Sequence, residues 1–195
     1  MIVLDVEQGS DEWFHARLGI PTASCFDKII TGTGKASTSA EGYRRELLAE
    51  WKTGKPLVSY KSEWMERGNE IEQEALDYYG LMVKHLEPGK FCYLDERKLI
   101  GCSPDAMGLE MKCPKANTQV EYLLKGKMPT KYIPQVQGCM WITGAEQWDF
   151  LSYHPDLESL IVTVKRDDAY IEAMSKMVEK FIDKMMEERN ALQSC

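Results

Sequence analysis

The chain has 195 residues and a formal net charge of −7, and 44% of its residues are hydrophobic. This length suits one domain that buries about two-thirds of its unfolded surface, and the composition excludes a disordered chain. There is no apolar run near the roughly 20 residues that span a bilayer and no basic signal-peptide start, so we expect a cytoplasmic protein without membrane contact. The acidic balance argues against a general nucleic-acid binder, although net charge says little about one groove.

The cysteine pattern argues against both a disulfide framework and a zinc site. The six cysteines form no CxxC pair, and no histidine stands at a zinc-binding spacing from them. They are Cys25, Cys92, Cys102, Cys113, Cys139 and Cys195. Idle thiols in a reducing compartment are the expected state.

Helical signals dominate the first 80 residues. Ser10 is a plausible N-cap of a short helix that stops at Gly19, and residues 22–30 form a second short helix. Residues 43–54 form a longer helix with basic residues in its last turn. Residues 61–79 form an amphipathic helix, because apolar positions recur at spacings of three, four and seven. Those positions are Trp64, Ile71, Ala75 and Tyr78.

Short strands follow, then helices again. The predicted strands cover residues 81–87, 91–96, 98–106 and 108–113, and two more cover residues 147–154 and 160–166. The predicted helices cover residues 118–126, 132–144 and 167–191. One face of the last helix is a stripe typical of core or subunit packing: Ile171, Met174, Met177, Val178, Phe181 and Met185. We therefore expect an α/β fold with one central mixed sheet flanked by helices, in a single domain over residues 1–195.

Residues 101–114, GCSPDAMGLEMKCP, carry more charge than an ordinary core strand. The two-residue period of a strand places Glu110 and Lys112 on one face and Met111 on the other, toward the core. Pro114 lacks the amide of a sheet ladder and ends the strand.

A tight turn at residues 106–108 can fold Asp105 back beside Glu110, so that two carboxylates and the Lys112 ammonium converge. Converging carboxylates repel unless a cation or a proton intervenes. Hard oxygen ligands suit Mg²⁺ or Mn²⁺. The spacing alone leaves two interpretations open: a metal site whose lysine acts on the attacking water, or a solvated hairpin with a glutamate–lysine pair.

The stretch SPD…LEMKCP resembles the P-D…(D/E)-x-K signature of restriction-endonuclease-like nucleases. Three further motifs, EQGSDEWFHARLGIPTAS, RGNEIEQEA and PQVQGCMWITGAEQWDFLSYHP, stand in the order typical of phage lambda exonuclease-like viral recombinases. The resemblance covers most of residues 7–155 and favours the metal-site interpretation. It implies a restriction-endonuclease-like fold. The turn between the motif Asp and Glu is shorter here than in that family, which could alter contacts with the substrate strand.

The resemblance also implies roles for individual residues of the catalytic centre. Asp105 and Glu110 resemble the metal ligands, and the backbone carbonyl of Met111 resembles another. Glu72 matches the extra acidic residue that completes the metal sphere, although by itself it could be a surface helix charge. Lys112 resembles the catalytic lysine.

Four more residues are implied around that centre. Gln135 resembles the motif glutamine, whereas Gln137 faces elsewhere on the helix. Arg17, Thr22 and Ser24 match a pocket that receives a 5′-phosphate. An arginine beside hydroxyls at a helix N-terminus is also a sensible phosphate site on physical grounds, although a surface ion pair with two caps is the alternative.

The resemblance implies a Mg²⁺-dependent 5′-to-3′ exonuclease that digests one strand of double-stranded DNA, with Mn²⁺ as a possible substitute. It further implies release of 5′-mononucleotides, a 3′ overhang, a homotrimeric ring, a single-strand annealing partner and the cytoplasm of a bacterial host. Two alternatives remain open: a structure- or sequence-specific endonuclease on the same fold, and a catalytically silent DNA-binding module. The intact set of Asp105, Glu110 and Lys112 argues against the silent module.

Two basic clusters flank the predicted site and could line a positive channel in an acidic protein. The first comprises Arg44, Arg45, Lys52, Lys55, Lys61 and Arg67. The second comprises Lys112, Lys115, Lys125, Lys127 and Lys131. Taken alone, either cluster could equally be a solvated face.

Overall fold

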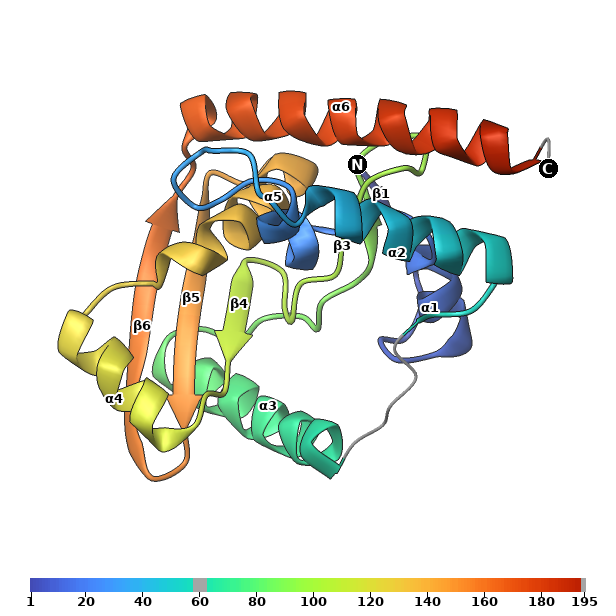
Figure 1. Ribbon diagram of the computed structural model, residues 1–195. Coiled ribbons are helices and arrows are strands. Elements are labelled where there is room, and N and C mark those ends of the chain that lie inside the picture. The colour runs from blue at the N-terminus through green and yellow to red at the C-terminus, as the bar shows by residue number, and fades with distance from the viewer. Residues whose placement is uncertain (58–62, 194–195) are drawn as a thin grey trace.

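The computed structural model describes residues 1–57 and 63–193, and the side chains of residues 63–70 lie outside the description. The fold is mixed α/β, as predicted (Figure 1). The strands are β1 (Ile2–Val3), β2 (Cys92–Tyr93), β3 (Gly101–Cys102), β4 (Leu109–Lys112), β5 (Gln147–His154) and β6 (Leu157–Lys165). The α-helices are α1 (Asp11–Arg17), α2 (Ala40–Thr53), α3 (Glu63–Met82), α4 (Ala116–Lys125), α5 (Ile133–Thr143) and α6 (Asp168–Gln193). Two 3₁₀ helices, η1 (Ala23–Lys28) and η2 (Thr130–Tyr132), complete the described elements.

The predicted helix ends follow local rules. The Ser10 side chain accepts a hydrogen bond from the Trp13 amide and caps α1. Helix α2 ends at Gly54, which adopts the left-handed conformation that glycine takes without steric cost. The residues predicted between 22 and 30 are helical, but as the tighter 3₁₀ form. Trp64, predicted on the apolar face of α3, lies outside the described side chains.

The strands form two three-stranded sheets where one was expected. In the first, β1, β2 and β3 are antiparallel, and in the second, β4 runs parallel to β5 while β5 and β6 are antiparallel. The second sheet is therefore mixed, as predicted. The separation occurs after β3, because Pro104 lacks a ladder amide and the chain turns at Gly108, where φ is +92°.

The parallel pairing of β4 and β5 requires a long connection, and α4, η2 and α5 supply it. In this register Glu110 lies opposite Phe150, and Lys112 lies opposite Ser152. The crossover carries the chain back to the start of the sheet, so that α5 lies close to both η1 and β5. This arrangement brings the Gln135 end of α5 to the strand with the predicted metal ligands.

Two strand predictions need correction. Residues 81–87 form no strand: α3 continues through Met82, and Leu81 is 87% exposed. Leu86 packs partly against the small core, but the other side chains of this segment are exposed, and Pro88 beyond them makes an isolated bridge to Ala106. The sequence QWDFLSYH of β5 alternates as expected for a strand with one exposed face, but residues 148–153 are all buried. The strand is central in its sheet, so both of its faces are covered.

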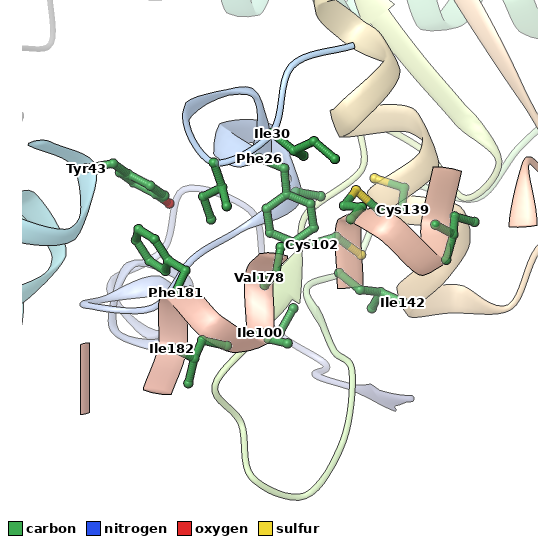
Figure 2. Close-up of a cluster of buried hydrophobic side chains, with 14 of the residues drawn as sticks. Phe26, Ile30, Tyr43, Ile100, Cys102, Cys139, Ile142, Val178, Phe181 and Ile182 are labelled. Atoms are coloured by element: carbon green, nitrogen blue, oxygen red, sulfur yellow. The ribbon is translucent and has the colours of Figure 1, made fainter. Parts of the chain in front are cut away.

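The main core lies where α6 and α2 cover α5, η1 and β3 (Figures 1 and 2). Tyr43 of α2 and Phe181 of α6 stack with ring centres 5.6 Å apart. The predicted stripe of α6 is buried in this core, with Met177 partly exposed at its edge. The stripe is thus core packing within one chain.

The five described cysteines are free thiols, and Cys195 lies outside the described residues. Within residues 1–57 and 63–193, no helix is both long enough and apolar enough to cross a membrane.

Candidate active site

The turn between β3 and β4 folds Asp105 back onto the strand, as the sequence predicts. Asp105 Oδ2 accepts a hydrogen bond of 2.6 Å from the Met111 amide. The turn closes with a bond of 3.0 Å from the Leu109 amide to the Ala106 carbonyl. From the other side, the Gly89 amide donates to the Asp105 carbonyl at 3.1 Å. The Asp105 carboxylate is therefore bound to the start of β4, and the Asp105 backbone is bound to Gly89 on the other side.

Strand β4 then alternates as expected. Met111 points into the small core between α3 and the sheet. On the opposite face, Glu110 is only 1% exposed, and its Oε1 is shared by two donors. Lys112 Nζ forms an ion pair with this oxygen, and Gln135 Nε2 donates to it at 2.6 Å. Glu110 Oε2 is buried and has no hydrogen-bond partner among the described residues.

Burial dominates the electrostatics of these acids. Burial and the neighbouring Asp105 charge raise the pKa of Glu110 to about 8. Burial also raises the pKa of Asp105, against the opposing effect of Lys112. Burial alone would lower the pKa of Lys112, but the Glu110 and Asp105 carboxylates outweigh it and raise that pKa. The cluster thus holds two buried acids against one ammonium, an arrangement that favours an added cation.

Glu72, on α3, lies on the same side of the site. Its side chain is largely exposed, yet partial burial and the Asp105 charge raise its pKa, while Lys112 lowers it. Across the described residues, no three His, Cys, Asp or Glu side chains lie close enough together to hold a metal ion unaided. The donors that fit a divalent cation are therefore the Asp105 and Glu110 carboxylates, with Glu110 Oε2 free to coordinate.

The two glutamines of α5 contact different parts of the protein. Gln135 reaches Glu110, whereas Gln137 donates to the Lys165 carbonyl at 2.9 Å and accepts from the Asp167 amide at 3.0 Å. Gln137 joins α5 to the end of β6 and does not touch the site. The predicted difference between the two residues follows from the 100° rotation per residue of a helix.

The residues predicted to bind a 5′-phosphate form a second group near the start of η1. The hydroxyls of Thr22 and Ser24 are 3.1 Å apart, and the Thr22 amide donates to the Tyr43 hydroxyl at 3.4 Å. The Arg17 guanidinium lies 4.1 Å from the centre of the Trp13 ring. Arg17 is half-buried, and burial lowers its pKa. In the described part of the chain it makes no ion pair and no side-chain hydrogen bond.

A pocket of about 340 Å³ is lined by Ser24 of this second group and by Lys112 and Gln135 of the catalytic group. Its lining residues are Ser24, Asp27, Lys112, Lys131, Tyr132 and Gln135. Lys112 Nζ and Lys131 Nζ lie 5.4 and 4.8 Å from the centre of the Tyr132 ring, and this ring stacks on Phe150. Lys131 was expected only as a member of a basic cluster, and Asp27 and Tyr132 were not among the predicted site residues. No local motif marks these two, because only the folded chain brings η1 and η2 together.

The first basic cluster is partly neutralised. Arg44 binds Glu188 and Arg45 binds Glu41, so neither guanidinium is unpaired. Lys61 and the Arg67 side chain lie outside the description. Lys112 and Lys131 are thus the cations that face the pocket directly.

Residues 12–146 match the YqaJ-like viral recombinase domain. The chain belongs to this family. Arg17, the β4 strand and Gln135 all fall inside the matched range, which covers two of the four motifs completely and the other two in part. The family match and the fold agree with the predicted likeness to lambda exonuclease-like recombinases.

Solved structures support the same family assignment for this chain. An alkaline exonuclease, LHK-Exo from Laribacter hongkongensis, superposes with a TM-score of 0.85 at 29% identity, covering 95% of this chain and 97% of that one. Its complex with dAMP gives a TM-score of 0.84 at 30% identity with the same coverage. A phage-related exonuclease from Haemophilus somnus 129PT shares the fold, with a TM-score of 0.64 at 17% identity over 87% of this chain and 96% of that one.

A shorter sequence match links the chain to the uncharacterized protein ExoD of Escherichia coli (strain K12). The two are 39% identical over 59 residues, which is 29% of this chain and 68% of ExoD. Together, the family and the alkaline exonuclease fold support a nuclease function.

Proposed function

We propose that the chain is a Mg²⁺-dependent exonuclease that digests one strand of linear double-stranded DNA from its 5′ end. It releases 5′-mononucleotides and leaves a 3′ overhang for single-strand-annealing recombination. The observation that carries the proposal is the buried Glu110 carboxylate with its unpartnered Oε2, joined to Lys112 and Gln135 at the edge of the pocket. The complex of the related LHK-Exo with dAMP supports a mononucleotide product.

Asp105 and Glu110 would hold the cation, with the Met111 carbonyl and Glu72 as further ligands. Bound Mg²⁺, or Mn²⁺ in its place, would neutralise charge on the phosphate and lower the pKa of a coordinated water. Asp105→Asn or Glu110→Gln should abolish cleavage while the protein stays folded, because each removes a charged oxygen ligand. Full activity of either variant with Mg²⁺ present would refute the ligand assignment.

The protein side chains orient the reaction. Lys112 Nζ, at the rim of the pocket, can donate a hydrogen bond to the attacking water or to a phosphate oxygen and stabilise the developing negative charge. Gln135 holds the Glu110 carboxylate in place. A bond forms between the water oxygen and phosphorus, the bond from phosphorus to O3′ breaks, and the proton lost by water ends on O3′.

Recognition of the 5′ end is assigned to Arg17, with Thr22 and Ser24. A half-buried guanidinium that makes no ion pair with the described residues is costly, and a terminal phosphate dianion would supply the missing charge. A charge-assisted pair of this kind contributes roughly 1.5–3 kcal/mol, or about ten- to hundred-fold in preference for a phosphorylated end. Ser24 also lines the catalytic pocket, so a phosphate bound there lies on the path to Lys112.

Digestion of linear duplex with a 5′-phosphate or a 5′-hydroxyl end tests this role. Arg17→Ala should erase most of the preference and leave slow cleavage of both substrates, because the metal ligands are unchanged. Arg45→Ala is the matched control, since Arg45 is exposed and pairs with Glu41. Equal wild-type rates on the two ends, with end recognition limiting, would refute the role of Arg17.

The reaction class is tested with three substrates and one chelator. Linear duplex should be degraded from the 5′ end with Mg²⁺ and not with EDTA, and covalently closed circular duplex should remain intact. Cleavage of the circle would identify an endonuclease on the same fold. Binding without cleavage of any substrate would identify a silent DNA-binding module.

The proposal includes assembly of the chain into a homotrimer. A closed ring of three chains around the duplex would give processive digestion, and a single-strand annealing protein would receive the 3′ overhang. Light scattering at micromolar concentration should give three times the 22.3 kDa mass of one chain. A mass equal to one chain would refute the ring.

A further inference from the structure

A second buried carboxylate lies outside the proposed chemistry. Asp149, on β5, is 6% exposed. Its Oδ2 accepts a hydrogen bond of 2.5 Å from the Tyr79 hydroxyl on α3, and its Oδ1 accepts one of 2.6 Å from Thr163 on β6. Lys84 Nζ lies 3.8 Å from Oδ2. Burial of a carboxylate is costly, and well-packed apolar residues often stabilise a fold as well or better. Stability alone therefore gives little reason for this charge.

The backbone of Asp149 meets the turn that carries the metal ligands. Its amide donates to the Gly108 carbonyl at 2.9 Å, and the residue pairs with Leu109 at the start of β4. Asp105 lies on one side of this turn and Glu110 on the other. Asp149 is thus bonded to the turn through its backbone and to α3 through its side chain.

Helix α3 otherwise packs against the sheet mainly through apolar side chains. Ala75 and Tyr79 pack with Leu109 and Met111 in a small core. The ribbon of α3 runs along the side of the sheet near β4 (Figure 1). The hydrophobic effect is non-directional, so a hydrogen bond adds a directional restraint to this packing. The bond between Tyr79 and Asp149 is such a restraint, because a hydrogen bond weakens steeply with distance and angle.

Glu72 precedes Tyr79 by seven residues, which is two helical turns, so both side chains lie on the same face of α3. A shift of the Tyr79 end along the sheet would move Glu72 by the same distance. A second bond, from the Tyr153 hydroxyl to Glu74 at 2.6 Å, keeps the helix attached when the first is lost. Removal of the Tyr79 hydroxyl should therefore displace α3 without releasing it.

We propose that Tyr79 and Asp149 are a positioning pair that fixes α3 against the β3–β4 turn, so that the Glu72 side chain stays near enough to turn toward a divalent cation held by Asp105 and Glu110. The inference rests on the proposed function, because it requires Glu72 to bind the cation. It adds two residues that touch neither substrate nor metal. Their effect passes through the position of one helix.

Isothermal titration of the metal-free protein with Mg²⁺ measures this effect without any DNA. Tyr79→Phe should weaken Mg²⁺ binding about five- to tenfold, as expected for the loss of one buried hydrogen bond. Thr163→Val is the matched control, since it removes the bond to the other oxygen of Asp149 on the side away from α3. Its Mg²⁺ affinity should stay within about twofold of wild type.

Two further variants separate positioning from general stability. Glu72→Gln should weaken Mg²⁺ binding, and the double variant Glu72→Gln with Tyr79→Phe should be no weaker than Glu72→Gln alone. Asp149→Leu removes the acceptor instead of the donor and should weaken binding as Tyr79→Phe does, which keeps a readout should Tyr79→Phe fail to fold.

The outcomes test the positioning pair and the assignment of Glu72 as a metal ligand separately. Wild-type Mg²⁺ affinity in Tyr79→Phe or in a folded Asp149→Leu protein would overturn the positioning pair. Equal losses from Tyr79→Phe with and without Glu72 would also overturn it, because the effect would then not pass through that carboxylate. Wild-type affinity in Glu72→Gln would instead refute the ligand assignment itself, and the positioning pair with it.

Discussion

Gln135 Nε2 lies 2.6 Å from Glu110 Oε1, the oxygen that also binds Lys112, and this contact orients the carboxylate with Oε2 free. Gln135→Leu should lower kcat roughly 10- to 100-fold, because a carboxylate that loses its orienting donor holds the cation poorly. Gln137→Leu is the matched control on the same helix. It should lower Tm and leave kcat near wild type, since Gln137 binds only backbone groups of residues 165 and 167. The same loss of kcat in both variants would mean that the helix, not the contact, matters.

Lys112 is expected to affect the rate of cleavage and not the affinity for DNA. Lys112→Ala should reduce turnover by roughly 10²–10⁴-fold while DNA still binds, because a group that stabilises the transition state acts mainly on kcat. Lys131→Ala, on the same pocket wall, should instead weaken DNA binding with little change in kcat. Fluorescence anisotropy with labelled duplex and single-turnover digestion measure the two quantities. A loss of DNA affinity in Lys112→Ala as large as the loss of rate would make this lysine a phosphate anchor.

Gly89 permits the approach of two backbone segments. A Cβ on residue 89 would lie 1.7 Å from the Pro104 carbonyl oxygen, next to the proposed ligand Asp105. Gly89→Ala should therefore displace the β3–β4 turn, lower Tm and weaken Mg²⁺ binding. Gly42→Ala in α2 is the control, because a Cβ there meets no atom within 4 Å. It should stabilise the protein by about 0.5–1 kcal/mol. Unchanged Mg²⁺ binding in Gly89→Ala would show that the turn tolerates the shift.

The ion pair between α2 and α6 makes stability depend on pH. Arg44 donates to both oxygens of Glu188, at 2.8 and 3.1 Å, and this bond lowers the pKa of Glu188. An acid whose pKa is lowered by folding contributes stability above its unfolded pKa of about 4.3 and loses it as pH falls through the folded pKa. Glu188→Gln should thus cost about 0.3–1 kcal/mol in urea unfolding at pH 7 and almost nothing near pH 3. An equal cost at both pH values would exclude the ion pair as its source.

The sequence by itself determined the local parts of the protein. The alternation in residues 109–112 places Glu110 and Lys112 on one face and Met111 in the core, and the structure confirms it. The cap at Ser10 and the glycine at the end of α2 were predicted in the same way. These features depend on neighbours within a few residues, and the periods of 2.0 and 3.6 express them directly in the chain.

Tertiary structure alone decided which distant residues meet. Gln135 reaches Glu110 across 25 positions, and Tyr79 reaches Asp149 across 70. The apolar residues within 81–87 predicted a strand, yet no described strand lies beside them. Strand β5 is buried on both faces because it lies between β4 and β6. A strand needs a partner and a buried carboxylate needs a donor, and neither is recorded in the local pattern. Those partners are selected by packing of the whole chain, so the local pattern indicates candidate site residues but not the distant residues that contact them.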